Sequence, residues 1–149
     1  GTVASVPRLM SGNGTIVATG SIAYPVGLGE IGDDRDPAAR SAVDADLPPA
    51  GFDLWHDRAA FHFLTDASDR AAYIERLTGA VVPGGHAIIA TFAPDGPERC
   101  SGLPVVRYDP AALAEVVGPS FRLVEHIEHQ HRTPGNTIQS FQFSVFERA

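Results

Sequence analysis

The stretch from residue 52 to residue 97 constrains the fold more than any other part of this sequence. It opens with a short apolar run at residues 52–55 (FDLW), which ends at the polar residues His56, Asp57 and Arg58. A second run, at residues 87–92 (AIIATF), is apolar on both faces, as expected of a strand buried between two layers. A helical pattern separates the two runs. Strand, helix and strand in this order predict a parallel α/β unit.

The helical pattern has a recognisable start and end. Thr65 or Asp66 can cap the first turn, because either side-chain oxygen can accept a free amide proton there. Five residues then recur at spacings of three and four, which predicts one apolar helix face. They are Ala71, Ile74, Leu77, Thr78 and Val81. The sequence PGG at residues 83–85 predicts the end of this helix and the turn into the second strand.

A second helix and two strands complete the pattern. Asp109 followed by Pro110 predicts a helix start, and Gly118 followed by Pro119 predicts its end. Alternating apolar residues predict strands around residues 121–127 and 141–145, with a turn at residues 133–136 that pairs them antiparallel. This order is typical of the second half of an open α/β sheet. Ligands bind there beyond the carboxyl ends of the parallel strands, which makes residues 56–58 and 93–99 the candidate binding loops.

The first 50 residues give weaker signals. Residues 15–19 and 21–26 predict two short strands, residues 27–34 a loop, and residues 37–43 a short helix. We therefore divide the chain into a Gly-rich N-terminal segment, residues 1–43, and an α/β domain, residues 44–149, within a single domain overall.

The composition excludes several classes of protein. The chain of 149 residues has a formal charge of −7, which disfavours binding to nucleic acid phosphates. No apolar run reaches the roughly 18–20 residues of a membrane span. The N-terminus has no basic region followed by an apolar run, so we expect no secretory signal. The single cysteine, Cys100, excludes an internal disulfide and favours a reducing cytoplasm. We expect a cytoplasmic protein without a membrane or nucleic-acid partner.

Three segments resemble class I S-adenosylmethionine-dependent methyltransferases. Residues 52–58, followed by FHF at residues 61–63, are similar to the fourth strand of that family and the segment after it. VPGG at residues 82–85 resembles the entry to the fifth strand, and the closing hairpin resembles strands six and seven. The resemblance covers residues 52–149. It implies an α/β Rossmann-like sheet, incomplete in this chain, that ends in an antiparallel hairpin.

The resemblance also implies a reaction and a cofactor. The reaction is methyl transfer from S-adenosylmethionine to a small-molecule or protein acceptor, with donor and acceptor held in line and a base where the acceptor loses a proton. By position, His56 and Asp57 are the candidate catalytic residues. The candidate cofactor-binding residues are Asp46, Leu47, His56 and Arg58. The competing interpretation is that Asp57 and Arg58 only cap and pair at a strand end, and that His62, between two aromatic residues, is a core histidine.

The glycine-rich cofactor turn of the family has no clear counterpart in this sequence. The candidates are GNG at residues 12–14 and TGS at residues 19–21, and neither has the expected glycines after an acid-ended strand. Three interpretations stay open: a truncated or frame-shifted methyltransferase, a compact non-catalytic relative that acts in binding or assembly, or another mode of cofactor binding. An exposed sheet edge would favour a homodimer, because unpaired strand edges recruit partners.

A histidine-rich stretch offers a different chemistry. On a strand, Glu125, His129 and His131 share one face and approach a zinc-ligand pattern, with His126 and Glu128 on the other face. A solvated polar edge strand explains the same pattern, and no cysteine stands at zinc-ligand spacing. We therefore expect no metal site. No Gly-x-Ser-x-Gly hydrolase motif and no phosphate-binding Gly-x-x-x-x-Gly-Lys motif is present.

Overall fold

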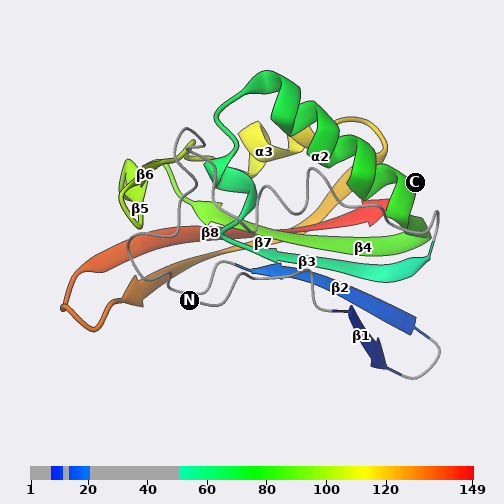
Figure 1. Cartoon of the computed structure of the whole chain (residues 1–149), viewed down its shortest axis with the longest axis horizontal. Helices are drawn as coiled ribbons and strands as arrows, with labels where there is room; N and C mark the ends of the chain where they lie inside the picture. Colours follow the sequence, from blue (N-terminus) through cyan, green and yellow to red (C-terminus); the bar gives the residue numbers. More distant parts are fainter. Residues whose placement is uncertain (1–7, 12–13, 21–50) are drawn as a thin grey trace, which may run out of the picture.

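The computed structural model describes residues 8–11, 14–20 and 51–149. Six strands form one open sheet in the order β1-β2-β3-β4-β8-β7 (Figure 1). The central strands β2, β3 and β4 run parallel, and β1, β8 and β7 each pair antiparallel with a neighbour. The bounds are β1 Arg8–Ser11, β2 Gly14–Gly20, β3 Phe52–Arg58, β4 Val81–Phe92, β8 Ile138–Arg148 and β7 Phe121–Arg132. This mixed, open α/β sheet is the fold class expected from the sequence.

The strand–helix–strand unit at the centre is confirmed, with one boundary moved. β3 leads through the short 3-10 helix η1, Phe61–Phe63, into α2, Ala67–Ala80, and on to β4. Asp66 is the N-cap residue of α2, but its side chain makes no capping hydrogen bond. The helix ends at Ala80, and Pro83, Gly84 and Gly85 lie inside β4. The sequence placed the end of the helix too late, because PGG here shapes a strand rather than a helix terminus.

The buried face of α2 is rotated from the predicted one. Its buried residues are Tyr73, Leu77 and Ala80, whereas Ala71 is exposed and Ile74 only half-buried. The reason lies in tertiary contacts: Tyr73 donates a hydrogen bond to Asp57 and packs edge-on against Trp55, with ring centroids 5.6 Å apart. Burial of a large aromatic side chain outweighs the small gain from Ala71.

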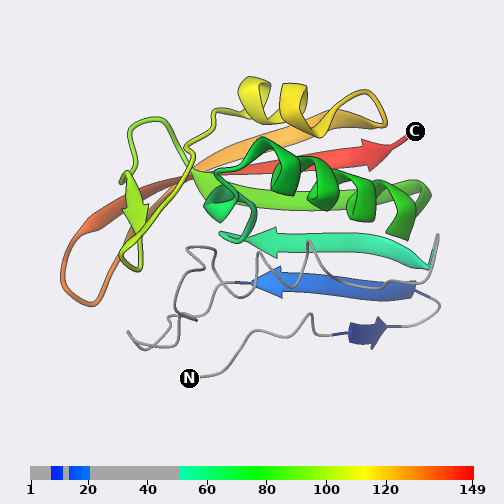
Figure 2. The same ribbon diagram turned by 45° about the horizontal axis from the view of Figure 1, so that its top comes forward.

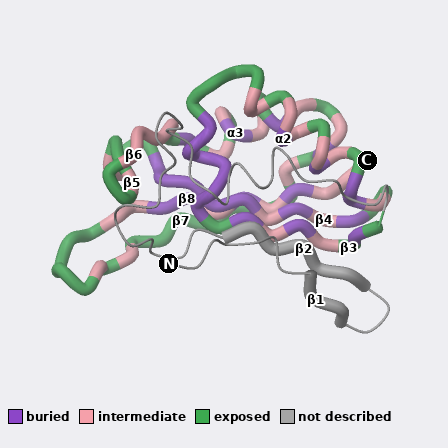
Figure 3. Tube along the Cα trace, viewed as in Figure 1, coloured by how far each residue is buried: buried purple, intermediate pink, exposed green. Residues whose placement is uncertain are grey.

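Both helices cover the same face of the sheet (Figures 1 and 2). The main core lies between them and the strands, and Figure 3 shows it as the buried centre of the molecule. Its fully buried members include Trp55, Ile89 and Phe146 from the sheet, and Leu77 and Leu113 from the helices. Side chains on the other face of the described sheet do not pack against these two helices (Figures 1 and 2).

The second helix and the closing hairpin are also confirmed. α3, Pro110–Val117, begins after Asp109, whose carboxylate accepts a hydrogen bond from the Ala112 amide at 2.7 Å. It ends at Gly118, whose φ of 87° favours glycine. β7 and β8 pair antiparallel along their length. A two-stranded ribbon, β5 Arg99–Cys100 with β6 Leu103–Pro104, follows β4 and precedes α3 along the chain.

The strand predicted at residues 15–19 is present as β2. It pairs in parallel with β3, so that Thr19 lies opposite Asp57 and Gly20 opposite Arg58. The predictions for residues 21–26, 27–34 and 37–43 lie outside the described residues. The division of the chain at residue 43 stays a prediction. Within the part of the chain that the structure describes, no helix is long and apolar enough to cross a membrane.

Gly85 and Gly79 should respond in opposite ways to alanine. A Cβ at Gly85 would lie 2.9 Å from the Val82 carbonyl oxygen and 3.0 Å from that of Asp53, both backbone atoms that cannot easily move. We expect Gly85→Ala to lower the free energy of unfolding by about 1–3 kcal/mol. Gly79, in α2, has open space around it, and Gly79→Ala should raise stability by about 0.5–1 kcal/mol. Urea denaturation measures both. A neutral Gly85→Ala variant would contradict the close approach of β3 and β4.

Candidate functional site

The three parallel strands end together at one edge of the sheet. β2, β3 and β4 end at Gly20, Arg58 and Phe92, and Figure 2 shows the arrows of β2 and β3 pointing the same way. The loop with η1 follows β3 at this edge, and the β5–β6 ribbon follows β4. In open α/β sheets ligands bind beyond this edge. The candidate site is therefore built from the ends of β3 and β4 and the loops after them.

The predicted site residues lie on opposite faces of β3, because successive side chains of a strand alternate. Trp55 and Asp57 are fully buried toward α2, whereas His56 is half-buried and Arg58 exposed on the other face. The structure thus brings His56 and Arg58 together and separates Asp57 from them. Asp46 and Leu47, the other two predicted cofactor-binding residues, lie outside the described residues.

Asp57 fastens the loop that follows β3. Its Oδ1 accepts a hydrogen bond from the Ala60 amide at 2.8 Å, and its Oδ2 accepts one from the Phe61 amide at 3.0 Å. Ala59, which precedes both amides, has a φ of 60°, a left-handed conformation that non-glycine residues rarely adopt. Two charge-assisted hydrogen bonds hold the chain in this turn and cap η1. The capping role weighed from the sequence is what the geometry describes, and proton abstraction by Asp57 stays a prediction.

Two aromatic side chains extend this arrangement into the core. The Tyr73 hydroxyl donates to Asp57 Oδ2 at 2.5 Å and accepts from Trp55 Nε1 at 2.9 Å. All three side chains are fully buried. A buried carboxylate is costly unless it is hydrogen-bonded, and here three donors satisfy it. The network joins β3, η1 and α2 at the point where the candidate site begins.

His56 and Arg58 form the polar part of the other face. Burial lowers the pKa of His56, and the positive charge of Arg58 lowers it further. The imidazole is therefore neutral near pH 7 and has a lone pair available to accept a proton. Arg58, exposed at the end of the strand, presents a guanidinium that can bind a carboxylate through two hydrogen bonds.

His62 connects the loops on the buried side. Its Nδ1 accepts a hydrogen bond from the Phe92 amide at 3.1 Å, and its carbonyl oxygen accepts one from the Val106 amide at 2.8 Å. Nε2 is buried and has no hydrogen-bond partner among the described residues. Burial lowers the pKa of His62 to about 3, so the ring is neutral. His62 is thus a core residue, as interpreted from its aromatic neighbours, but only one of its ring nitrogens is paired.

Sequence reasoning missed two participants at this edge, Tyr73 and Phe92. Tyr73 stood outside the predicted helix face, and Phe92 was interpreted only as the last residue of a strand. No local pattern identifies the first, because its bond to Asp57 spans 16 residues. The role of Phe92 was missed for the same reason, because its amide donates to His62, 30 residues away in the sequence.

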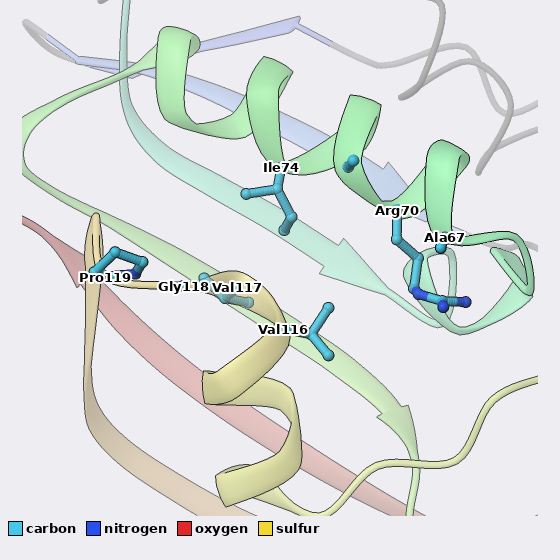
Figure 4. A pocket seen from close by; sticks show the side chains of 8 residues that line it. Ala67, Arg70, Ile74, Val116, Val117, Gly118 and Pro119 are labelled. Atoms are coloured by element: carbon cyan, nitrogen blue, oxygen red, sulfur yellow. The ribbon is translucent and has the colours of Figure 1, made fainter.

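A hollow in the surface lies on the helix-covered face of the sheet, opposite to the face of His56 and Arg58. It has a volume of about 420 Å³ and lies between the start of α2 and the end of α3, on the helix-covered face (Figure 4). Arg70 and Ala67 line it from α2, and Val116 and Pro119 from the end of α3. Arg70 is engaged, because its Nη1 donates to the Leu64 carbonyl oxygen at 3.1 Å. We therefore do not place the candidate site there.

The histidine-rich stretch belongs to β7. His126, Glu128 and His129 are exposed on this strand. In the described ranges, no group of three histidine, cysteine, aspartate or glutamate side chains is arranged to hold a metal ion.

Several solved structures similar to this chain are methyltransferases. One from Methanosarcina mazei matches with a TM-score of 0.57 and 9% identity, over 72% of this chain and 64% of that one. The 1,6-didemethyltoxoflavin-N1-methyltransferase from Burkholderia thailandensis, with S-adenosylhomocysteine bound, matches with a TM-score of 0.56 and 19% identity, over 72% and 48%. The N-methyltransferase NodS from Bradyrhizobium japonicum, also with S-adenosylhomocysteine, matches with a TM-score of 0.54 and 14% identity, over 72% and 50%.

These matches confirm the resemblance at the level of the fold. At such identities they show the class I methyltransferase architecture alone. The chain spans about half to two thirds of the length of these three structures. No protein-family model matches the sequence, and no curated protein does.

Asp57 and Asp109 offer a matched test of the anchor. Both carboxylates accept backbone hydrogen bonds, but Asp57 is buried and also binds Tyr73. Asp57→Asn turns one acceptor into a donor that faces other donors, and we expect the free energy of unfolding to fall by about 2–3 kcal/mol. Asp109→Asn should change it by less than about 0.5 kcal/mol, because asparagine caps helices as well as aspartate does. Equal effects of the two substitutions in urea denaturation would contradict the proposed anchor.

His62 should make the protein less stable in acid. The unfolded chain takes up a proton on this histidine below about pH 6.5, whereas the folded protein does so only near pH 3. Between these values stability falls as pH falls, by up to about 1.4 kcal/mol per pH unit. His62→Asn keeps an acceptor near the Phe92 amide but cannot titrate. Wild type should therefore lose about 2 kcal/mol more than the variant between pH 7 and pH 5. Parallel stability curves for the two proteins would overturn this assignment.

Proposed function

We propose that this chain carries part of a methyltransferase site, for methyl transfer from S-adenosylmethionine to a small-molecule or protein acceptor. The observation that carries the proposal is the pairing of His56 with Arg58 on one face of β3, where that strand ends at the ligand-binding edge of the sheet. The related folds that contain S-adenosylhomocysteine support the choice of cofactor.

The residues present fit one end of this cofactor. Its methionine part carries a carboxylate, and the exposed guanidinium of Arg58 is a suitable partner for it. His56, two residues earlier on the same face, contributes a half-buried polar group beside it. Asp46 and Leu47 remain the proposed contacts for the adenine end.

His56 is the better proposed base of the two catalytic candidates. Its lowered pKa keeps the ring neutral, so it can accept the proton that an acceptor hydroxyl or amine loses. Asp57, fully buried and bonded to three donors, is better suited to hold the loop in place. We therefore propose that Asp57, on the face toward α2, is a positioning residue and that His56, on the opposite face, is the base.

When bound, the cofactor supplies an electrophilic methyl group on a positively charged sulfur. Arg58 would hold the carboxylate of this cofactor, which would donate its methyl group to the acceptor lone pair and leave as the neutral thioether. The chain's contribution is to hold the two reactants in line and to take up the released proton at His56.

The alternative is a non-catalytic module that acts in binding or assembly. Two observations favour it: Asp57 is fully used by the fold, and the chain spans only part of the enzymes it resembles. Affinity for the cofactor separates the two, because an enzyme requires it.

Titration calorimetry with S-adenosylhomocysteine tests the proposal. We expect binding with a micromolar dissociation constant by the 149-residue chain. Arg58→Ala should weaken it about tenfold or more through loss of a charge-assisted contact. His86→Ala is the matched control, since His86 is a half-exposed histidine that pairs with Leu54 toward the opposite end of the strands and lies 3.6 Å from Glu147.

The outcomes separate the two functions. Unchanged affinity in His86→Ala, with loss in Arg58→Ala, supports a site at the end of β3. Absence of binding by a folded wild-type sample would exclude the enzyme proposal and leave the assembly module. Equal affinity of wild type and Arg58→Ala would show that the cofactor binds elsewhere.

A further inference from the structure

β7 is an edge strand with an unusual length of exposed chain. It is the last strand of the described sheet, and residues 124–130 are all exposed, on both of its faces. Ile127 is 55% exposed, and Figure 3 shows the tip of the β7–β8 hairpin as exposed. Within the described ranges, residues 122–131 make no backbone hydrogen bond except those with β8. The outer edge of β7 thus offers a row of donors and acceptors for another strand.

The side chains along this edge are complementary to those of a second, antiparallel copy. Residues 125–129 read EHIEH. If two copies of β7 pair antiparallel with Ile127 opposite Ile127, then Glu125 faces His129 and His126 faces Glu128. A twofold axis repeats each pair, so four glutamate–histidine pairs flank the two isoleucines. Directly opposite side chains in an antiparallel pair lie on the same face and interact. A glutamate carboxylate there can accept a hydrogen bond from the ring N–H of the histidine opposite it.

Neighbouring registers lack this match. A shift by one position in one direction places Glu125 opposite Glu128, and in the other direction places His126 opposite His129. The first register is disfavoured by repulsion between the two carboxylates, and the second places two histidines opposite each other without a carboxylate to accept their hydrogen bonds. At the ends of the favoured register Arg122 faces Arg132, but Arg122 forms an ion pair with Glu147 at 3.3 Å and Arg132 donates a hydrogen bond to Asn136. The sequence of β7 therefore selects one register.

From this unpaired edge and its pattern of glutamate and histidine side chains, we infer that β7 pairs antiparallel with β7 of a second copy of this chain, centred on Ile127. The two six-stranded sheets then form one continuous sheet across a twofold axis. This interface uses neither His56 nor Arg58, so it holds whether or not the chain transfers methyl groups.

Sedimentation velocity of the 149-residue chain tests the interface. Wild type should show a concentration-dependent dimer. Ile127→Lys places two ammonium groups at the twofold axis and should weaken association about tenfold or more. Ile138→Lys is the control, because Ile138 is 50% exposed on the same hairpin and pairs with Arg132, away from the axis. It should dimerise like wild type.

A charge exchange tests the register itself. His129→Glu places glutamates opposite each other and should weaken the dimer. Adding Glu125→His to His129→Glu restores opposite pairs and should restore association. A monomeric wild type at the highest soluble concentration would overturn the inference. So would a dimer that Ile127→Lys leaves intact, because it would use another surface, such as the β1 edge.

Discussion

A single buried carboxylate joins the end of β3 to the loop and the helix that follow it. Asp57 has two backbone amides of the following loop and the hydroxyl of Tyr73 as donors, and Trp55 bonds to that hydroxyl in turn. The carboxylate thereby fixes three things at once: the left-handed turn at Ala59, the start of η1, and the rotation of α2. Without these hydrogen bonds the carboxylate of Asp57 would be buried and unsatisfied, and the left-handed turn after β3 would not be stabilised.

Successive side chains of β3 alternate between the two faces of the sheet, so Asp57 points to one face and His56 and Arg58 to the other. Trp55 and Asp57 face α2 and are fully buried in the core, whereas the next residues along the strand point to the other face and are more exposed. His56 and Arg58 lie on that second face, and Arg58 lowers the pKa of the histidine beside it. On β7, by contrast, the side chains of residues 124–130 are exposed on both faces of the strand. The groups available for contacts there are these side chains and the backbone groups along the outer edge of the sheet.

Much of this fold could be predicted from the sequence, because it depends on local patterns. Apolar runs predicted β3 and β4, the Asp109 cap and Gly118 gave both ends of α3, and alternation gave the closing hairpin. The buried face of α2 could not be predicted, since the bond between Tyr73 and Asp57 links residues 16 positions apart. PGG was misinterpreted as a helix end, because only the approach of β3 explains Gly85 inside a strand. Strand alternation was sufficient to separate Asp57 from His56, and the sequence reading did not apply it.

The most direct test of a ligand site beyond the anchored edge is amide hydrogen exchange with and without S-adenosylhomocysteine. The ligand should slow exchange in residues 56–64 and 92–96, where β3 and β4 end, and should leave α2 beyond Arg70 and α3 unchanged. Protection confined to the hollow between α2 and α3, or no protection in a folded sample, would contradict the account.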